Sequence, residues 1–234
     1  YIITVDFQPN DLAIPEGSGT GTLTVTPGAA ASLTLNPGDT SASVGQMVTE
    51  VATVLDSEQY PVADGTVVNY VVTGDNTASG TATTLNGQAL ISYSGAFIGS
   101  DTLTVTAVGG SQPSARATID WTSPPSTPRA SVTAMSLGSP TLQVIVNSGA
   151  RGQASGSLSY AAGSLQLSQI QIEGLTVSGS NATIFGTAHL RDRSTVSFRL
   201  ELTASRFSGG TARMQLSNGY DSGQFSVPIL RVTP

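Results

Sequence analysis

The sequence predicts an all-β protein in which two antiparallel β-domains stand in tandem behind a short N-terminal strand extension. Thr, Ser, Gly and Val dominate the composition, whereas strong helix formers are scarce. Short runs alternate between apolar and polar residues, as expected for strands with one buried face. Gly, Pro and Asn-Gly turn signals separate these runs at short intervals. The length of 234 residues allows one to three domains of ordinary size.

The first 28 residues form the strand extension. Residues 1–7 alternate regularly, so that Tyr1, Ile3, Val5 and Phe7 point to one face. A second strand is expected at residues 20–26. Two strands alone are not stable in water, so the extension must join another sheet. We expect residues 1–7 to act as a donor strand inserted into another copy, with docking onto this chain's own Ig-like domain as the alternative.

Residues 29–122 are predicted to form a β-sandwich. Asn86-Gly87 predicts a type I′ hairpin within it. Glu50 falls in phase with Ala52 and Val54, where an apolar residue is expected, and we therefore place it at a solvated strand end. The expected strands are residues 32–35, 48–55, 66–72, 89–93 and 101–107.

Three segments of this region resemble the bacterial Ig-like domains of the invasin and intimin class. They are Val54-Leu-Asp-Ser-Glu-Gln-Tyr-Pro-Val, Thr84-Leu-Asn-Gly-Gln-Ala-Leu-Ile and Leu103-Thr-Val-Thr-Ala. The resemblance covers about 90 residues and implies an Ig-like sandwich on the cell surface, without catalytic residues.

Residues 123–129 contain three prolines and are predicted to be an extended, fairly stiff linker. Residues 130–234 are again rich in strands, and Asn218-Gly219 marks their last hairpin. Pro228 lies inside the final run, which therefore should be an edge strand there. Expected strands are residues 142–146, 165–167, 170–172, 175–177, 183–190, 196–202, 213–217 and 224–232.

This second region resembles the β-domain of post-COAP type that closes many bacterial surface proteins. The resemblance is carried by Gly156-Ser-Leu-Ser-Tyr, Ser197-Phe-Arg-Leu-Glu-Leu, Asn218-Gly-Tyr-Asp-Ser-Gly and the segment from Leu175 to Gly186. An Asp-rich turn that is frequent in that family is replaced here by Ser205-Arg-Phe-Ser-Gly-Gly. The resemblance implies a surface location more than an activity.

The charges divide the chain into two halves. Residues 1–115 carry ten acids and no base, whereas residues 116–234 carry nine arginines and five acids. Their formal charges are therefore −10 and +4, which gives the net charge of −6. Such polarity favours contact between the acidic half of one copy and the basic half of another.

Absent residue types exclude several classes of function. Without Cys there is no disulfide, thiolate nucleophile or Cys-ligated metal, and without Lys there is no Schiff base or isopeptide staple. The acidic balance argues against nucleic acid as a partner. No run approaches the ~20 apolar residues of a membrane span. Because the chain starts at Tyr1 without Met, we expect a cleaved export signal and a secreted, cell-surface location.

Few residues are candidates for chemistry, and no catalytic, cofactor or metal site is predicted. His189 is the only histidine and stands in an ordinary strand pattern without a nucleophile motif. Asp56, Glu58 and Asp64 could supply oxygen ligands to calcium, but they match no known loop pattern and are expected to be solvated.

Other residues are candidates for contacts with glycans or with a second copy. Asn181-Ala-Thr is a glycosylation sequon, and Trp121 and Tyr60 could stack on surface glycans. Arg191 and Arg193 share one face of an extended chain and could pair with acids of a neighbouring subunit.

The sequence therefore favours a structural role over catalysis. Our leading hypothesis is a secreted subunit that assembles head to tail into a filament, with the N-terminal strand added to the next copy. The alternatives are a stalk or adhesin fragment of a larger surface protein, and accessory domains of a secreted hydrolase.

Overall fold

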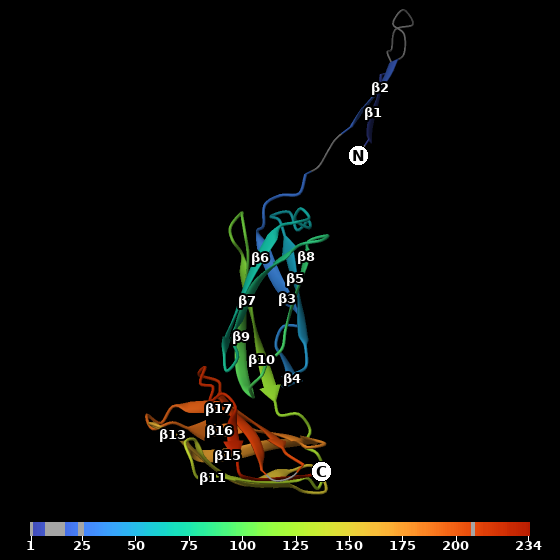
Figure 1. Ribbon diagram of the computed structural model, residues 1–234. Helices are drawn as coiled ribbons and strands as arrows, with labels where there is room; N and C mark the ends of the chain where they lie inside the picture. Colours follow the sequence, from blue (N-terminus) through green and yellow to red (C-terminus); the bar gives the residue numbers. More distant parts are fainter. Residues whose placement is uncertain (1, 8–16, 23–25, 207–208) are drawn as a thin grey trace, which may run out of the picture.

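The chain folds into two β-sandwiches and a separate N-terminal hairpin (Figure 1). The computed structural model describes residues 2–7, 17–22, 26–206 and 209–234. These residues form 20 strands and no helix, which confirms the predicted all-β class. No helix in this part of the chain could therefore span a bilayer.

The N-terminal sandwich packs a five-stranded sheet on a three-stranded sheet. In the larger sheet the pairing order is β4-β10-β9-β6-β7, and in the smaller it is β3-β5-β8. Only the pairing of β4 with β10 is parallel. The strands are β3 (Ser32–Asn36), β4 (Thr40–Ser43), β5 (Val48–Leu55), β6 (Val67–Gly74), β7 (Ala78–Thr83), β8 (Gln88–Tyr93), β9 (Gly99–Ala107) and β10 (Ser114–Thr122).

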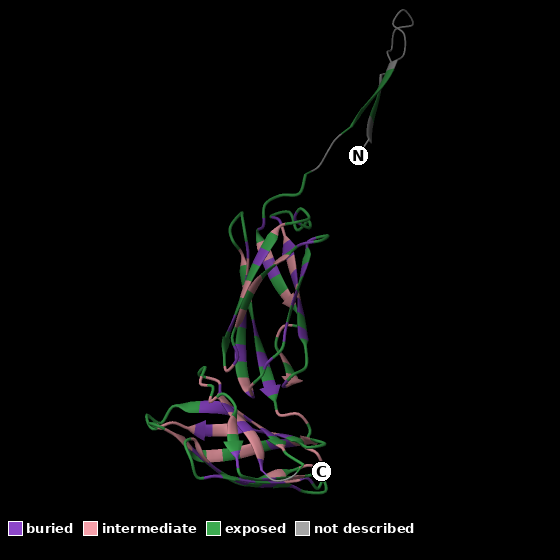
Figure 2. Cartoon of the chain, viewed as in Figure 1, coloured by how far each residue is buried: buried purple, intermediate pink, exposed green. Residues whose placement is uncertain are grey.

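Alternation along these strands builds the core between the two sheets. In β9, Leu103, Val105 and Ala107 are fully buried while the threonines between them face outward. Figure 2 shows the resulting alternation of buried and exposed residues along the strands. The predicted type I′ hairpin is present, because Asn86 and Gly87 have φ values of +52° and +73°.

Glu50 is not solvated, which corrects the prediction. Its side chain is only 1% exposed and lies among the inward-facing residues of β5. One carboxylate oxygen accepts the Gly38 N–H at 2.9 Å, and the other has no partner among the described residues. Burial raises the pKa of Glu50, the Gly38 N–H opposes this shift, and nearby Asp39 adds to it.

Replacing Glu50 with Gln should stabilise the protein by about 1 kcal/mol at neutral pH. Since its folded-state pKa is raised, native Glu50 holds its proton to higher pH than the unfolded chain does. Its contribution to stability therefore falls as pH rises from the ordinary value through the raised pKa. Urea unfolding between pH 4 and 8 should show a smaller decline for Glu50→Gln, whereas the exposed control Glu58→Gln should behave like the wild type. A steeper decline in Glu50→Gln would contradict this explanation.

The C-terminal sandwich packs two five-stranded sheets against each other. Their pairing orders are β14-β13-β12-β11-β20 and β15-β16-β17-β18-β19. The strands are β11 (Ser131–Ser136), β12 (Thr141–Ser148), β13 (Ala154–Ala162), β14 (Leu165–Gln166), β15 (Ser168–Ser178), β16 (Asn181–His189), β17 (Thr195–Ala204), β18 (Gly210–Leu216), β19 (Phe225–Val227) and β20 (Ile229–Thr233).

Pro228 marks the place where the chain changes sheets. The predicted single strand over residues 224–232 is two strands, because β19 pairs with β18 and β20 pairs with β11 in the other sheet. Both strands lie at the edge of their sheets, as the proline predicted. The crossing links the two layers along one side of the sandwich, around a core that includes Phe198, Leu200 and Met214.

Candidate functional site

The N-terminal hairpin forms a sheet of its own. Its strands β1 (Ile2–Phe7) and β2 (Gly17–Thr22) pair antiparallel over six residues, from Ile2 opposite Thr22 to Phe7 opposite Gly17. Neither strand pairs with a strand of either sandwich. The described strands therefore show no pairing of the hairpin with the sheets of the chain's own N-terminal sandwich. Among the described strands, one edge of each hairpin strand has no backbone partner.

Only part of the predicted donor face can be placed. Val5 is 65% exposed, as expected for a strand without a covering sheet. Tyr1 and the side chains of Ile3 and Phe7 lie outside the described residues. The second strand is described over Gly17–Thr22 and includes three residues before the predicted start at residue 20, whereas residues 23–25 of the predicted strand lie outside the described residues.

The linker between the sandwiches is bound along strand β15. The Thr127 N–H donates to the Leu175 carbonyl at 2.8 Å, and the Leu175 N–H donates to the Ser126 hydroxyl at 3.0 Å. The Val177 N–H donates to the Thr127 hydroxyl at 2.8 Å. Backbone and hydroxyl groups of the linker thus bond to the backbone of β15 and hold the proline-rich segment in one extended path. This attachment restricts movement between the two sandwiches.

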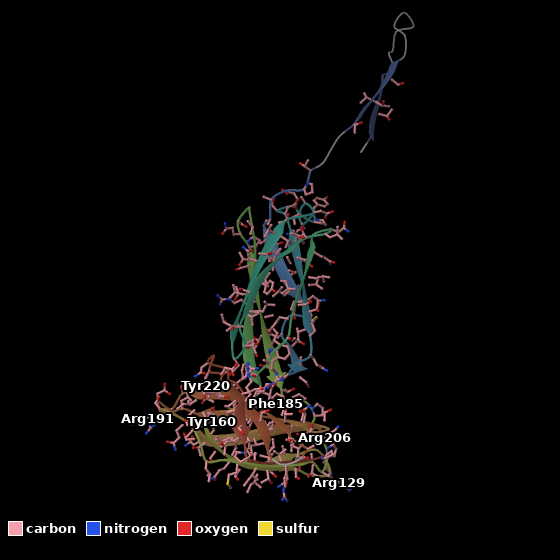
Figure 3. The ribbon with its side chains drawn as sticks, viewed as in Figure 1. Arg129, Tyr160, Phe185, Arg191, Arg206 and Tyr220 are labelled. Atoms are coloured by element: carbon pink, nitrogen blue, oxygen red, sulfur yellow. The ribbon has the colours of Figure 1, made fainter. Side chains whose placement is uncertain are left out.

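Phe185 connects the two hydrophobic cores. It belongs to β16 of the C-terminal sandwich, yet its side chain is 4% exposed within the buried cluster of the N-terminal sandwich. Figure 3 shows Phe185 where the two sandwiches meet. Opposite it in the ladder is Gly174, next to an irregularity in β15. A Cβ atom at Gly174 would lie 2.8 Å from the Ser123 side chain, so glycine permits this close approach.

A buried carboxylate organises the adjoining end of the N-terminal sandwich. Asp101 is fully buried and accepts hydrogen bonds from the Asn76 N–H at 2.8 Å and the Trp121 indole N–H at 2.7 Å. The Tyr93 hydroxyl lies 3.4 Å from the same oxygen as the indole. Asn76 in turn accepts the Phe97 N–H at 2.9 Å, which fixes the loop facing the C-terminal sandwich.

The network shifts the pKa values of its acidic groups. Burial raises the pKa of Asp101, although the donors Asn76 and Trp121 partly offset the rise. Burial and the Asp101 charge also raise the pKa of Tyr93 above its usual range. Asp101 has the same strand phase as Leu103 and Val105, so sequence phase could have revealed an acid aimed at the core.

Two clefts of about 300 Å³ and 590 Å³ flank the junction. Asp75, Phe97, Gln215 and Tyr220 are among the residues that line the first, and Asp120 and Glu173 are among those that line the second. These clefts offer carboxylates, amides and hydroxyls for polar contacts. In the described parts of the chain no group of three or more His, Asp or Glu side chains is placed to hold a metal ion.

The other predicted site residues have structural surroundings. The His189 ring lies 3.4 Å from the Thr195 hydroxyl, and its carbonyl accepts the Ser168 hydroxyl at 3.1 Å. Asp56 accepts backbone N–H groups of Tyr60, Gly28 and Glu58, which lower its pKa in that order of effect, with Tyr60 first. Asp56 is only 4% exposed, which corrects the prediction that it is solvated, and it closes its own turn and holds the chain that enters β3. Glu58 and Asp64 are exposed.

The aromatic candidates for glycan stacking have different surroundings. Trp121 is only 3% exposed, so its ring cannot stack on a surface sugar. Tyr60 is 65% exposed and remains available for such contacts. Asn181 of the sequon is also exposed, at the start of β16.

Arg191 and Arg193 lie in a tight turn and not on an extended strand, which corrects the predicted geometry. The turn joins β16 to β17, with the Arg193 N–H donating to the Leu190 carbonyl at 2.9 Å. Arg193 has a φ of +68°, in the left-handed region. Both arginines are exposed, and Asp192 stands between them. Pairing with acids of a second copy remains a prediction.

Comparison with known proteins gives no family for this chain. No protein-family model matches it, and no curated protein matches its sequence. The invasin and intimin type and the post-COAP type therefore remain predictions, whereas the all-β sandwich fold is established by the structure.

Two solved structures have limited likeness to the chain. Fibronectin(III)-like modules of CbhA from Clostridium thermocellum share 15% identity, with a TM-score of 0.29 over 70% of this chain and 88% of theirs. Domains 4–9 of the surface layer protein SbsC share 12% identity, with a TM-score of 0.32. That alignment covers 98% of this chain and 35% of the SbsC chain. At these scores neither likeness assigns a family or a function.

Proposed function

We propose that this chain is an extracellular structural subunit that joins other copies of itself through its N-terminal hairpin. The main support for this proposal is that β1 and β2 pair only with each other among the described strands. An isolated two-stranded hairpin is marginally stable in water, and its free edges offer unsatisfied N–H and C=O groups. Addition to the edge of another sheet would supply partners for these groups.

The donor unit is the whole hairpin and not a single strand. Inserting β1 alone would first break its six-residue ladder with β2. Adding the hairpin through its outer edge keeps that ladder and makes a new one. The edge strands β7 and β8 of the N-terminal sandwich are each six residues long, like β1, and each has one ladder partner. They offer acceptors of matching length in a second copy.

A stalk segment of a larger surface protein is the second candidate function. It is favoured by the junction, where Phe185 and the bound linker join the sandwiches into a spacer of fixed form. A stalk needs this stiffness but has no need of a hairpin with free edges. The two functions therefore differ in what removal of the hairpin does.

Deleting residues 1–22 should abolish assembly without unfolding either sandwich. The hairpin shares no ladder with them, so the thermal unfolding of the truncated chain should match that of the full chain. Negative-stain electron microscopy should show fibres for the full chain and monomers for the truncated one. A synthetic peptide of residues 1–22 should cap growing ends and shorten the fibres. Fibres formed equally well by the truncated chain would overturn the hairpin mechanism, and a monomeric full chain would favour the stalk.

A further inference from the structure

Three arginines gather at one end of the C-terminal sandwich. Arg129 precedes β11, and its N–H donates to the Gly149 carbonyl at 3.2 Å in the turn that carries Arg151. Arg206 lies in the connection from β17 to β18. Figure 3 shows Arg129 and Arg206 at the same end of the sandwich, with Arg191 at the opposite end. We call Arg129, Arg151 and Arg206 the basic end.

The basic end has no acidic partner among the residues that the structure describes. All three arginines are exposed, and neither of the ion pairs among the described residues involves them. Those pairs are Arg199 with Glu201, at 2.6 Å, and Arg213 with Asp221. Asp192 lies in the turn between Arg191 and Arg193, and Glu173 lies at the domain junction. The acidic residues of the C-terminal sandwich thus lie in ion pairs, in the turn after β16 or at the domain junction, and not beside the three arginines of the basic end.

The far end of the N-terminal sandwich carries the complementary chemistry. The loops that join β5 to β6, β7 to β8 and β9 to β10 form this end, which we call the distal tip and which lies away from the C-terminal sandwich (Figure 1). It presents exposed Glu58 and Asp64 beside Tyr60, which is 65% exposed. Leu85 and Val108 add apolar surface, being 66% and 47% exposed. The Asn86 N–H bound to Asp64 at 2.6 Å shows that two of these loops adjoin.

We propose that the basic end of one copy receives the distal tip of a second copy. Arginine pairs with carboxylates through two parallel hydrogen bonds and stacks on aromatic rings, so Glu58, Asp64 and Tyr60 are suitable partners. Two different surfaces meet in this contact, so each copy keeps one basic end or one distal tip to bind a further copy. The inference rests on the proposed end-to-end assembly and supplies a second contact besides the hairpin.

The arginines of the basic end differ from Arg191 and Arg193, which the sequence analysis suggested for contact with a second copy. Arg191 and Arg193 lie at the other end of the sandwich and flank Asp192. Arg191 and Arg193 therefore provide a matched control for Arg129 and Arg151. Each of the two pairs contains one arginine with a left-handed φ, +60° at Arg129 and +68° at Arg193. Removing either pair changes the net charge equally and strains the backbone alike.

The first test compares the assembly rates of the full chain and two double variants by light scattering. Arg129→Gln/Arg151→Gln should slow assembly about tenfold or more at low salt, since charge steering acts mainly on encounter. Salt at about 1 M should slow the wild type and the control Arg191→Gln/Arg193→Gln, but it should hardly change the slow variant. Equal slowing by the two double variants would overturn the assignment. Unchanged thermal unfolding of both excludes a folding defect.

A label measurement separates this contact from the hairpin mechanism. Because the chain has no cysteine, Ser57→Cys gives a single position for a nitroxide at the distal tip. It should broaden the NMR signals of residues 149–152 in an unlabelled copy. Broadening without fibres would leave this contact standing and reject the proposed function. Fibres without broadening and without salt dependence would reject the contact and leave hairpin addition standing.

A charge exchange tests whether the occupant is a second copy or another anion. A chain that combines Arg129→Glu/Arg151→Glu with Glu58→Arg/Asp64→Asn has two acids in place of two arginines at the basic end, and one arginine and one neutral amide in place of the two exposed acids at the distal tip. If copies bind each other, this combined variant should recover most of the rate that Arg129→Glu/Arg151→Glu alone loses. If the basic end instead takes an anionic glycan or phosphate polymer, the combined variant should stay slow, and that outcome would overturn the proposal.

Discussion

Replacing Phe185 with alanine is expected to uncouple the two sandwiches while each remains folded. The ring is 4% exposed and lies in the hydrophobic cluster of the sandwich to which its own strand does not belong. Truncation of a buried phenylalanine typically costs about 3–5 kcal/mol. Here the loss falls on the contact between the sandwiches, because the ring contributes little to the core of its own sandwich.

The single tryptophan allows this effect to be measured. Trp121 lies in the N-terminal sandwich, so its fluorescence reports the unfolding of that sandwich. Calorimetry reports the unfolding of both sandwiches. Phe185→Ala should separate the two transitions and broaden the distance distribution in small-angle X-ray scattering. The control Phe198→Ala, in the core of the C-terminal sandwich, should lower the stability of that sandwich alone. A scattering curve unchanged in Phe185→Ala would show that the bound linker suffices to fix the junction.

Alternation in the sequence predicted most individual strands because one face of each strand is buried. The expected strand at residues 48–55 coincides with β5, in which every second residue is buried. Asn86-Gly87 likewise formed the expected turn, since the left-handed φ at both positions is a local property of these residue types. Local signals of this kind depend little on the rest of the fold.

The parts that were missed depend on contacts between distant residues. Phe185 has the pattern of an ordinary strand residue that points away from the core residue Ile184, and only the packing of the N-terminal sandwich against that face buries it. Glu50 was misplaced because sequence phase does not show that the Gly38 N–H would meet its carboxylate. The same limit applies to the arginines, whose grouping at one end is set by which turns share that end.

Replacing Asp101 with alanine should have the largest effect on the N-terminal sandwich. The carboxylate accepts the Asn76 N–H with one oxygen and the Trp121 indole N–H with the other, while Tyr93 also faces it. Alanine would leave these buried donors without partners and open a cavity between the sheets. Each unpaired buried donor costs about 1–3 kcal/mol, so we expect a total loss of about 3–5 kcal/mol.

Asp101→Asn separates the hydrogen bonds from the charge. An amide has one accepting oxygen, so one of the two N–H donors would face an NH2 group, and about 1–3 kcal/mol should be lost. Because burial raises the pKa of Asp101, the wild-type contribution falls as pH rises from the ordinary value through the raised pKa. Urea unfolding followed by Trp121 fluorescence should therefore show a weaker pH dependence in the variant. Asp120→Asn is the control, since Asp120 is exposed on the adjacent strand β10 and should change stability little. Equal losses at the two positions would show that the buried network does not hold this end of the sandwich together.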